Sequence, residues 1–162
     1  MPYLIDGNNV MGQIPGWHRD KRAARFRLLE QLAQFQRIKR AAITVVFDGA
    51  PETNFPDGSS YKGVRIYYSE RGSDADTRIK KIVESHRNPK SLTVVTSDNR
   101  LIGYVRSCSA AVERSGEFRK AMEAAIASSP STEDVAEPDA SDLSGWMRYF
   151  GVAPEDDELD EE

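Results

Sequence analysis

Residues 3–10, which read YLIDGNNV, constrain the fold of this chain more than any other stretch. A short apolar run ends in a carboxylate, a glycine and two carboxamides before apolar character returns. This pattern is typical of a buried strand that delivers polar groups at its carboxyl end, where the ligand crevice of an open parallel sheet lies. The same device recurs at residues 44–49 (TVVFDG) and 92–99 (LTVVTSDN). Three strands that end in aspartate predict a shared acidic site.

The first 128 residues alternate between strand and helix patterns. Apolar residues spaced three and four apart predict the longest helix, and shorter helices follow further along the chain. The helices are expected over residues 19–40, 74–86, 99–107 and from 115 to about 128. After the first strand, further strands are expected over residues 42–48, 63–69, 92–98 and 109–113. The order β-α-β-β-α-β-α-β-α predicts a three-layer α/β domain with a mostly parallel central sheet.

The segment over residues 49–62 is rich in Gly, Pro and Ser and is expected to be a loop. It follows the second strand that ends in aspartate, where substrate contacts are expected. Phe55 and Tyr61 in this loop could stack on bases or cover the core, and both interpretations stay open.

Helical periodicity separates two further candidate acids. Asp76 shares a helix face with apolar residues three and seven positions later, so we expect its side chain to lean toward the sheet. Asp74 falls on the outer face and suits an N-cap. The predicted acidic site therefore has four members, which are Asp6, Asp48, Asp76 and Asp98.

Carboxylates without histidine or cysteine neighbours favour Mg²⁺ or Mn²⁺ over Zn²⁺ as the bound ion. One or two such ions could promote phosphodiester hydrolysis, since paired ions stabilise both the attacking and the leaving oxygen. Packed carboxylates also need a cation, because they otherwise raise each other's pKa. Asn8 or Asn9 could orient Asp6 or a metal-bound water, and Ser97 is a similar candidate beside Asp98.

The formal net charge of −4 hides a strong asymmetry along the chain. Of the 26 acidic residues, 12 lie in residues 131–162 together with one of the 22 basic residues, so the first 130 residues hold 21 basic against 14 acidic groups. Such a surface suits a polyanion such as nucleic acid, although an ordinary solvated surface has a similar composition. The candidate nucleic-acid contacts are Arg19, Lys21, Arg22, Arg25, Lys62 and Arg100.

Residues 129–162 form a separate acidic segment. Its linker-like composition predicts disorder over residues 129–141. A short amphipathic helix is expected over residues 142–151, where four apolar side chains fall at i, i+3, i+4 and i+7. A helix on an acidic tether fits docking into a groove of a protein partner, or docking onto this protein's own domain. We therefore divide the chain into a domain over 1–128 and a tail over 129–162.

Three features point to the cytoplasm. No apolar run approaches the roughly 18 residues that cross a membrane. The first expected strand begins at Tyr3 and leaves no room for a signal peptide. The single cysteine, Cys108, excludes an intramolecular disulfide.

These residues together resemble the YacP-like branch of the NYN domains, within the PIN-like nuclease superfamily. The resemblance runs from Tyr3 to Ala127 and depends on the order of several motifs. The opening LIDGNNV is similar to the family's Ile-Asp-Gly-Tyr-Asn-Val, and VVFDG is similar to its second acidic strand. GSDAD resembles the family's helix start, where Ala-Asp-Asp is usual. VTSD resembles the last acidic strand, and SGEF the start of the final helix.

The resemblance implies a PIN-like, Rossmann-like fold and a metal-dependent endoribonuclease that acts on RNA. It implies that Asp6, Asp48, Asp76 and Asp98 bind the metal, with Asn9 as their polar companion. Two positions depart from the family pattern: Asn8 stands where an aromatic residue is usual, and Thr77 replaces the second Asp of Ala-Asp-Asp. The tail after Ser128 is expected to lie outside the resemblance.

Two other functions stay open at this stage. One is an RNA-binding adaptor that has lost activity and recruits a partner through its tail; four intact acids argue against it. The other is a structure-specific DNA nuclease, since related folds include flap-cutting enzymes. The absence of an obvious extra DNA-binding module favours RNA.

Overall fold

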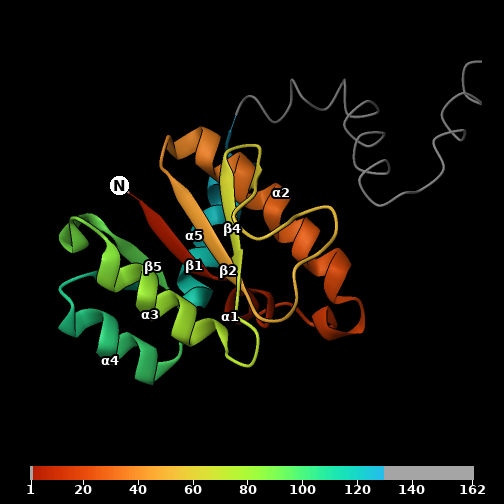
Figure 1. Ribbon diagram of the computed structural model, residues 1–162. Helices are drawn as coiled ribbons and strands as arrows, with labels where there is room; N and C mark the ends of the chain where they lie inside the picture. Colours follow the sequence, from red (N-terminus) through yellow and green to blue (C-terminus); the bar gives the residue numbers. More distant parts are fainter. Residues whose placement is uncertain (1, 130–162) are drawn as a thin grey trace, which may run out of the picture. The chain divides into compact units, whose positions relative to one another are not determined.

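The computed structural model of the protein describes residues 2–129, which contain a six-stranded sheet with helices on both faces (Figure 1). The strands are β1 (Tyr3–Asp6), β2 (Ile43–Phe47), β3 (Ser60–Tyr61), β4 (Val64–Tyr68), β5 (Thr93–Val95) and β6 (Ala111–Glu113). Their order across the sheet is β3-β4-β2-β1-β5-β6. Every neighbouring pair is parallel except β3 and β4. The three-layer α/β fold with a mostly parallel sheet is therefore confirmed.

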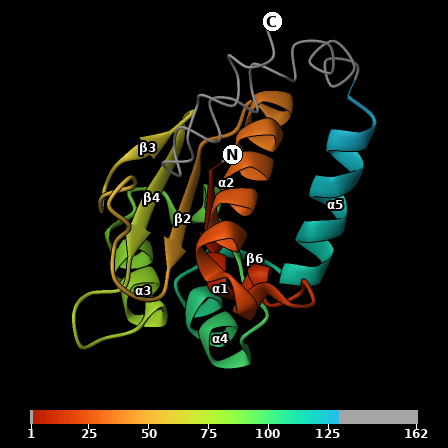
Figure 2. The ribbon, with the colours of Figure 1, turned by 90° about the vertical axis from the view of Figure 1, so that its right-hand side faces the viewer.

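Helices connect β1 to β2, β4 to β5 and β5 to β6, and a last helix follows β6. They are α1 (Gly7–Met11), α2 (Lys21–Lys39), α3 (Ala75–Ser85), α4 (Asn99–Ser107) and α5 (Ser115–Ala127), with short 3₁₀ turns η1 (Trp17–Arg19) and η2 (Pro89–Ser91). Figure 2 shows α2 and α5 on one side of the sheet and α3 and α4 on the other. The central strands β1, β2 and β5 are almost entirely buried, as expected for parallel strands covered on both faces.

Each face of the sheet has its own apolar layer. Under α3 and α4, buried aliphatic side chains such as Leu4, Ile79 and Val105 belong to one continuous cluster. On the opposite face, Phe35 of α2 meets Phe118 of α5 with ring centroids 5.3 Å apart. These layers fix the helices on the sheet and with them the residues at the helix N-termini.

Gly7 allows the chain to turn into α1 directly after Asp6. A Cβ atom at this position would lie 2.6 Å from Cδ1 of Phe47, well inside the normal contact distance. The missing side chain therefore lets the end of β1 pack closely on β2. The sequence analysis did not predict α1, because five residues are too few to show helical periodicity.

The predicted strands and longer helices are present, with most boundaries shifted by one or two residues; the strand expected over 92–98 ends three residues earlier, at Val95. The expected loop over 49–62 is wrong at its end, where Ser60–Tyr61 forms β3 and pairs antiparallel with β4. Phe55 and Tyr61 are 7% and 3% exposed and pack on Phe26, so they cover the core and are not available to stack on bases.

The expected disorder over 129–141 and the helix over 142–151 lie outside the described residues, apart from residue 129, and stay predictions. Within the described part of the chain, no helix is long and apolar enough to cross a membrane.

Candidate active site

The parallel strands bring three of the predicted acids to one edge of the sheet. In the register, Asp6 lies opposite Val46 of β2, and Ile5 lies opposite Val95 of β5. Asp48 directly follows the end of β2, and Asp98 lies three residues beyond β5. All three therefore lie at the carboxyl edge, where open α/β sheets bind their ligands.

Asp6 is the buried member of the set, with 5% of its surface exposed. Its Oδ2 accepts a hydrogen bond of 2.9 Å from Oγ1 of Thr96, which is itself fully buried. Burial raises the pKa of Asp6 to about 6, the negative charges of Asp76 and Asp98 add to this rise, and the hydrogen bond from Thr96 opposes it. Asp6, Asp76 and Asp98 are therefore close enough to interact electrostatically.

Asp76 and Asp98 project from the first turns of α3 and α4. Burial contributes most to the raised pKa of Asp76, and the charges of Asp98 and Asp74 and a hydrogen bond with the side chain of Asp98 add to it. Asp98 also caps α4, because its Oδ1 accepts from the backbone N–H of Arg100 at 2.9 Å and of Leu101 at 3.3 Å. The N-termini of α3 and α4 therefore bring the carboxyl groups of Asp76 and Asp98 together.

Asp74 takes the separate role predicted for it. Its Oδ1 accepts from the backbone N–H and the hydroxyl of Thr77, at 3.0 and 2.8 Å. These hydrogen bonds lower the pKa of Asp74, in the direction opposite to Asp76. The N-cap prediction is confirmed, and Asp74 is distinct from the acidic site.

Asp48 lies at the exposed margin of the site. Its Oδ1 accepts from the backbone N–H of Ala75 at 3.2 Å, and its own N–H donates to Oδ1 of Asn8 at 2.8 Å. It is not among the charges that raise the pKa of Asp6 or Asp76. Ala75, the first residue of α3, therefore links the two acids: its N–H binds Asp48, and Asp76 is the next residue in the sequence.

The donor set suits a hard divalent cation. The charges that raise the pKa of Asp6 are carboxylates, and at Asp76 the charge of Lys80 partly offsets the rise. Carboxylate oxygens are preferred ligands of Mg²⁺ and Mn²⁺. Within the described part of the chain, no group of three or more Asp, Glu, His or Cys side chains is arranged to hold a metal ion. The acidic residues therefore fit an ion that is held by one or two carboxylates, with water and phosphate oxygens as its remaining ligands.

Asn9 joins three segments that are distant in sequence. Its Oδ1 accepts from the backbone N–H of Ser97 at 2.9 Å and from the hydroxyl of Ser115 at 2.6 Å. One amide oxygen thus ties the end of β1 to the turn before Asp98 and to the start of α5. The hydroxyl of Ser115, the first residue of α5, therefore donates to Asn9.

Thr96 is a site residue that the sequence analysis missed. Besides binding Asp6, its Oγ1 accepts from the backbone N–H of Asp98 at 3.2 Å, so one hydroxyl orients two acids. Ser97, the predicted candidate, instead uses its Oγ to accept from the backbone N–H of Ser115 at 3.0 Å. The sequence did contain a signal for Thr96, since a threonine at the end of a fully buried strand needs a hydrogen-bond partner inside the protein.

Replacing Asn9 with alanine is expected to lower the free energy of unfolding by about 1–3 kcal/mol, because buried Ser115 and the N–H of Ser97 lose their acceptor. Asn8→Ala is the matched control, since the side chain of Asn8 accepts from the exposed N–H of Asp48. Urea unfolding measures both variants. Equal losses in the two variants would contradict a special role for Asn9.

The predicted nucleic-acid contacts do not all lie near the acids. Arg100 is in the first turn of α4, and Arg19 and Lys21 are exposed near the start of α2. Lys62 precedes β4, whose first residue pairs with the first residue of β2, so Lys62 lies at the opposite edge of the sheet. It is therefore too far along the strands to join the others at the acidic site.

Two of these arginines are engaged within the protein. Arg25 is 13% exposed; it donates to Glu52 at 2.8 Å and to the carbonyl of Asp48 at 2.7 Å. Arg22 lies 3.3 Å from the same glutamate. Both arginines therefore hold the loop after β2, and any additional contact with nucleic acid stays a prediction.

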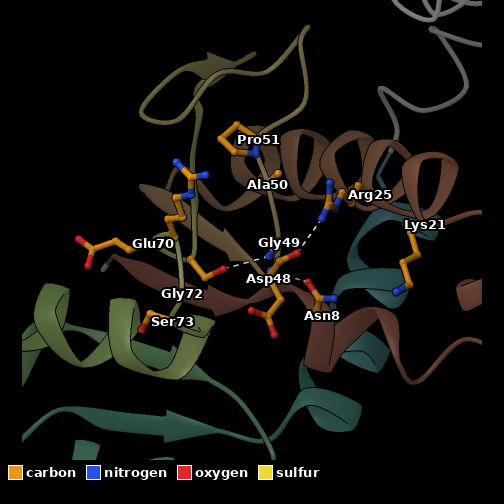
Figure 3. Close-up of a pocket in the computed structure, with 12 residues that line it drawn as sticks. Asn8, Lys21, Arg25, Asp48, Gly49, Ala50, Pro51, Glu70, Gly72 and Ser73 are labelled. Carbon is orange, nitrogen blue, oxygen red and sulfur yellow. Dashed lines mark hydrogen bonds between the residues drawn. The ribbon is translucent and has the colours of Figure 1, made fainter.

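A pocket of about 880 Å³ opens beside Asp48 (Figure 3). Its walls come from α1, the start of α2, the loop after β2 and the loop between β4 and α3. Asp48 is the one acid of the predicted set that lines it. The pocket is therefore a neighbour of the acidic cluster and does not contain it.

A three-layer fold with a mostly parallel sheet is common to many α/β families, and comparison with known families identifies the class to which this domain belongs. The YacP-like NYN domain matches residues 3–144, which is most of the chain, and this protein belongs to that family. The match extends past Ala127, so the expectation that the segment after Ser128 lies outside the family is wrong as far as residue 144.

Solved structures support the same fold. The crystal structure of Rae1 (YacP) from Bacillus subtilis is 19% identical, with a TM-score of 0.63, over 98% of this chain and 90% of that chain. A mutant form of the same protein is 23% identical, with a TM-score of 0.63, over 77% of this chain and 76% of that chain. No curated protein matches this chain significantly.

Proposed function

We propose that this protein is a metal-dependent endoribonuclease that hydrolyses RNA phosphodiester bonds at the carboxyl edge of its sheet. The observation that carries the proposal is the buried carboxyl of Asp6, whose pKa is raised to about 6 by burial and by two further acids. Keeping such charges together in the fold is costly unless a cation or a substrate group offsets them. Membership of a nuclease-type family supports the same conclusion.

Asp6, Asp76 and Asp98 would supply the one or two carboxylates that hold the Mg²⁺ or Mn²⁺ ion, and Asp48 would complete the acidic edge nearest the pocket. A bound ion of this kind stabilises charge on phosphoryl oxygens and generates a nucleophile from water at neutral pH. Thr96 holds Asp6 and Asp98 in position through its hydroxyl. Asn9 holds the turn that carries Asp98 against β1. Both polar residues therefore position the acids.

Basic side chains around this edge would hold the RNA backbone. Lys21 and Arg100 are exposed there, and the first 130 residues carry an excess of basic groups. Phosphate neutralisation by such groups supplies most sequence-independent affinity for nucleic acid. We place this activity in the cytoplasm, because a single cysteine is consistent with a reducing compartment in which the RNA substrate is also present.

The proposal predicts cleavage of labelled single-stranded RNA by the purified full chain in Mn²⁺, and no cleavage in EDTA. Flap-structured DNA under the same conditions is the comparison substrate. Gel analysis of internal cleavage products measures the result. Preferential cleavage of the DNA flap would assign the site to a DNA nuclease, and RNA binding without cleavage in Mn²⁺ would indicate an adaptor.

A further inference from the structure

The pocket beside Asp48 is not explained by the acidic cluster alone. Its volume of about 880 Å³ lies within the roughly 300–1,000 Å³ typical of sites for small molecules and cofactors. Figure 3 shows Lys21 on one side of the pocket, Glu70, Gly72 and Ser73 on the other, and Asp48 between them. This is ample space for a nucleotide-sized ligand.

Hydrogen bonds hold the walls of the pocket together. The backbone N–H of Gly49 donates to Oγ of Ser69 at 3.0 Å, which ties the loop after β2 to the end of β4. On the other side, Arg25 donates to the carbonyl of Asp48 at 2.7 Å. Asn8 accepts from the N–H of Asp48 at 2.8 Å. The pocket is therefore preformed, and a ligand entering it does not have to order these loops.

Two cations that line the pocket have no ion-pair partner among residues 2–129. Three basic residues line it, and Arg25 is engaged by Glu52. Over residues 2–129, neither Lys21 nor Arg71 forms an ion pair with a carboxylate. Lys21 lies 5.8 Å from the ring centre of Trp17, which leaves its charge available to an anion. Lys21 comes from α2 and Arg71 from the loop before α3, so the two cations reach the pocket from different elements.

The floor and rim supply the other features that a nucleotide requires. Ala50 and Pro51 present apolar surface against which a base can pack. Gly72 has a positive φ of 76°, and a Cβ atom there would meet no other atom within 4 Å, so the rim is open at this point. An apolar wall with a few charged groups is the usual composition of a small-ligand site.

Asp48 connects this pocket to the acids. Its carboxylate accepts from the N–H of Ala75, the residue directly before Asp76. A ligand that fills the pocket therefore lies against the margin of the proposed cleavage site. Resting on the proposed function, we propose that the pocket binds the nucleotide directly next to the cleaved phosphodiester, with Lys21 and Arg71 contacting phosphates of the RNA strand.

RNA affinity tests the two cations. Binding of a fluorescent single-stranded RNA is measured for the full chain carrying Asp6→Asn and Asp98→Asn, so that cleavage does not interfere. Adding Lys21→Ala or Arg71→Ala is expected to lower affinity about 3–10-fold and to reduce the slope of log affinity against log salt by about one.

The fold offers matched controls for both substitutions. Lys39 ends the same helix that Lys21 begins, and Arg87 lies beyond the far end of α3 from Arg71. Lys39→Ala and Arg87→Ala are expected to change the affinity less than twofold. Equal losses in pocket and control variants would show a diffuse charge effect and would overturn the proposal.

Single abasic substitutions along the RNA locate the nucleotide. After the wild-type protein has mapped the cleavage position, loss of the base directly beside it is expected to weaken binding, and to weaken it less in the Arg71→Ala background because the contacts are coupled. The same loss at every position, or full additivity with Arg71→Ala, would overturn the subsite. If RNA is cleaved and only these tests fail, the proposed function stands; if RNA is neither bound nor cleaved, both proposals fail.

Discussion

Replacing Asp6 and Asp98 together with asparagine is expected to lower RNA cleavage by about 10²–10⁴-fold. The substitutions remove two negative charges from the acidic cluster while keeping side-chain size and most hydrogen bonds. Divalent ions contribute several kcal/mol of transition-state charge stabilisation, and each 1.4 kcal/mol corresponds to a factor of ten in rate. The measurement is kcat/KM on a defined RNA in Mn²⁺. Asp76→Asn alone is expected to act in the same direction, because Asp76 shares a hydrogen bond with Asp98.

Asp74→Asn is the control that separates the acidic site from general charge. Asp74 lies two residues from Asp76, and replacing it with asparagine removes the same charge. Its carboxylate, however, caps α3 by accepting hydrogen bonds from Thr77. Asparagine is as good an N-cap as aspartate, so both stability and cleavage should be nearly unchanged. Cleavage that is equal in the wild type and in the Asp6/Asp98 double variant, or an equal loss for Asp74→Asn, would contradict the proposed site.

The Asp6→Asn variant alone is expected to be more stable than the wild type at neutral pH when no metal is bound. The pKa of Asp6 is raised from 3.8 to about 6 in the fold, so the folded protein binds the proton more tightly than the unfolded chain does. Wild-type stability is therefore highest below pH 3.8 with respect to this group, and falls as the pH rises through about 6. The difference corresponds to about 3 kcal/mol across that range.

Urea unfolding in EDTA at pH 4, 5, 6 and 7 measures this effect. The stability of Asp6→Asn relative to wild type should rise from pH 4 to about pH 6 and then level off, by an amount on the order of 1–3 kcal/mol, or a few degrees in Tm for a chain of this size. Mn²⁺ should then raise the Tm of the wild type at pH 7 and leave that of the Asp6/Asp98 double variant nearly unchanged. A stability difference that does not vary with pH would show that Asp6 carries no raised pKa.

The three acids at strand ends could be predicted because each depends on a local signal. A buried strand is apolar, so an aspartate at its end stands out, and parallel strands place their carboxyl ends at one edge. Helical periodicity likewise separated Asp76 from Asp74, since a side chain's face depends on its position within a few turns. The fold class and family resemblance rest on the same local patterns.

The partners of the polar residues were decided by tertiary structure. Asn9 binds Ser115, 106 positions later, and Thr96 binds Asp6, 90 positions earlier, and nothing in local sequence distinguishes these pairs from other combinations. The sequence alone could not choose between Asn8 and Asn9 by chemistry. In the structure, the side chain of Asn8 accepts a hydrogen bond from Asp48 at the start of the loop after β2. The side chain of Asn9 accepts one from Ser97, the residue before Asp98.

Basic residues show the same division between local and tertiary information. Lys62 has the same charge as Lys21, but the register of β4 with β2 places it at the opposite sheet edge. Arg25 is engaged by Glu52 and by the loop after β2. The sequence by itself determined which residues carry charge and which strands end in acids, because those properties are local. Only the tertiary structure decided which of them meet, because hydrogen bonds and ion pairs depend on positions that distant segments take when the core packs.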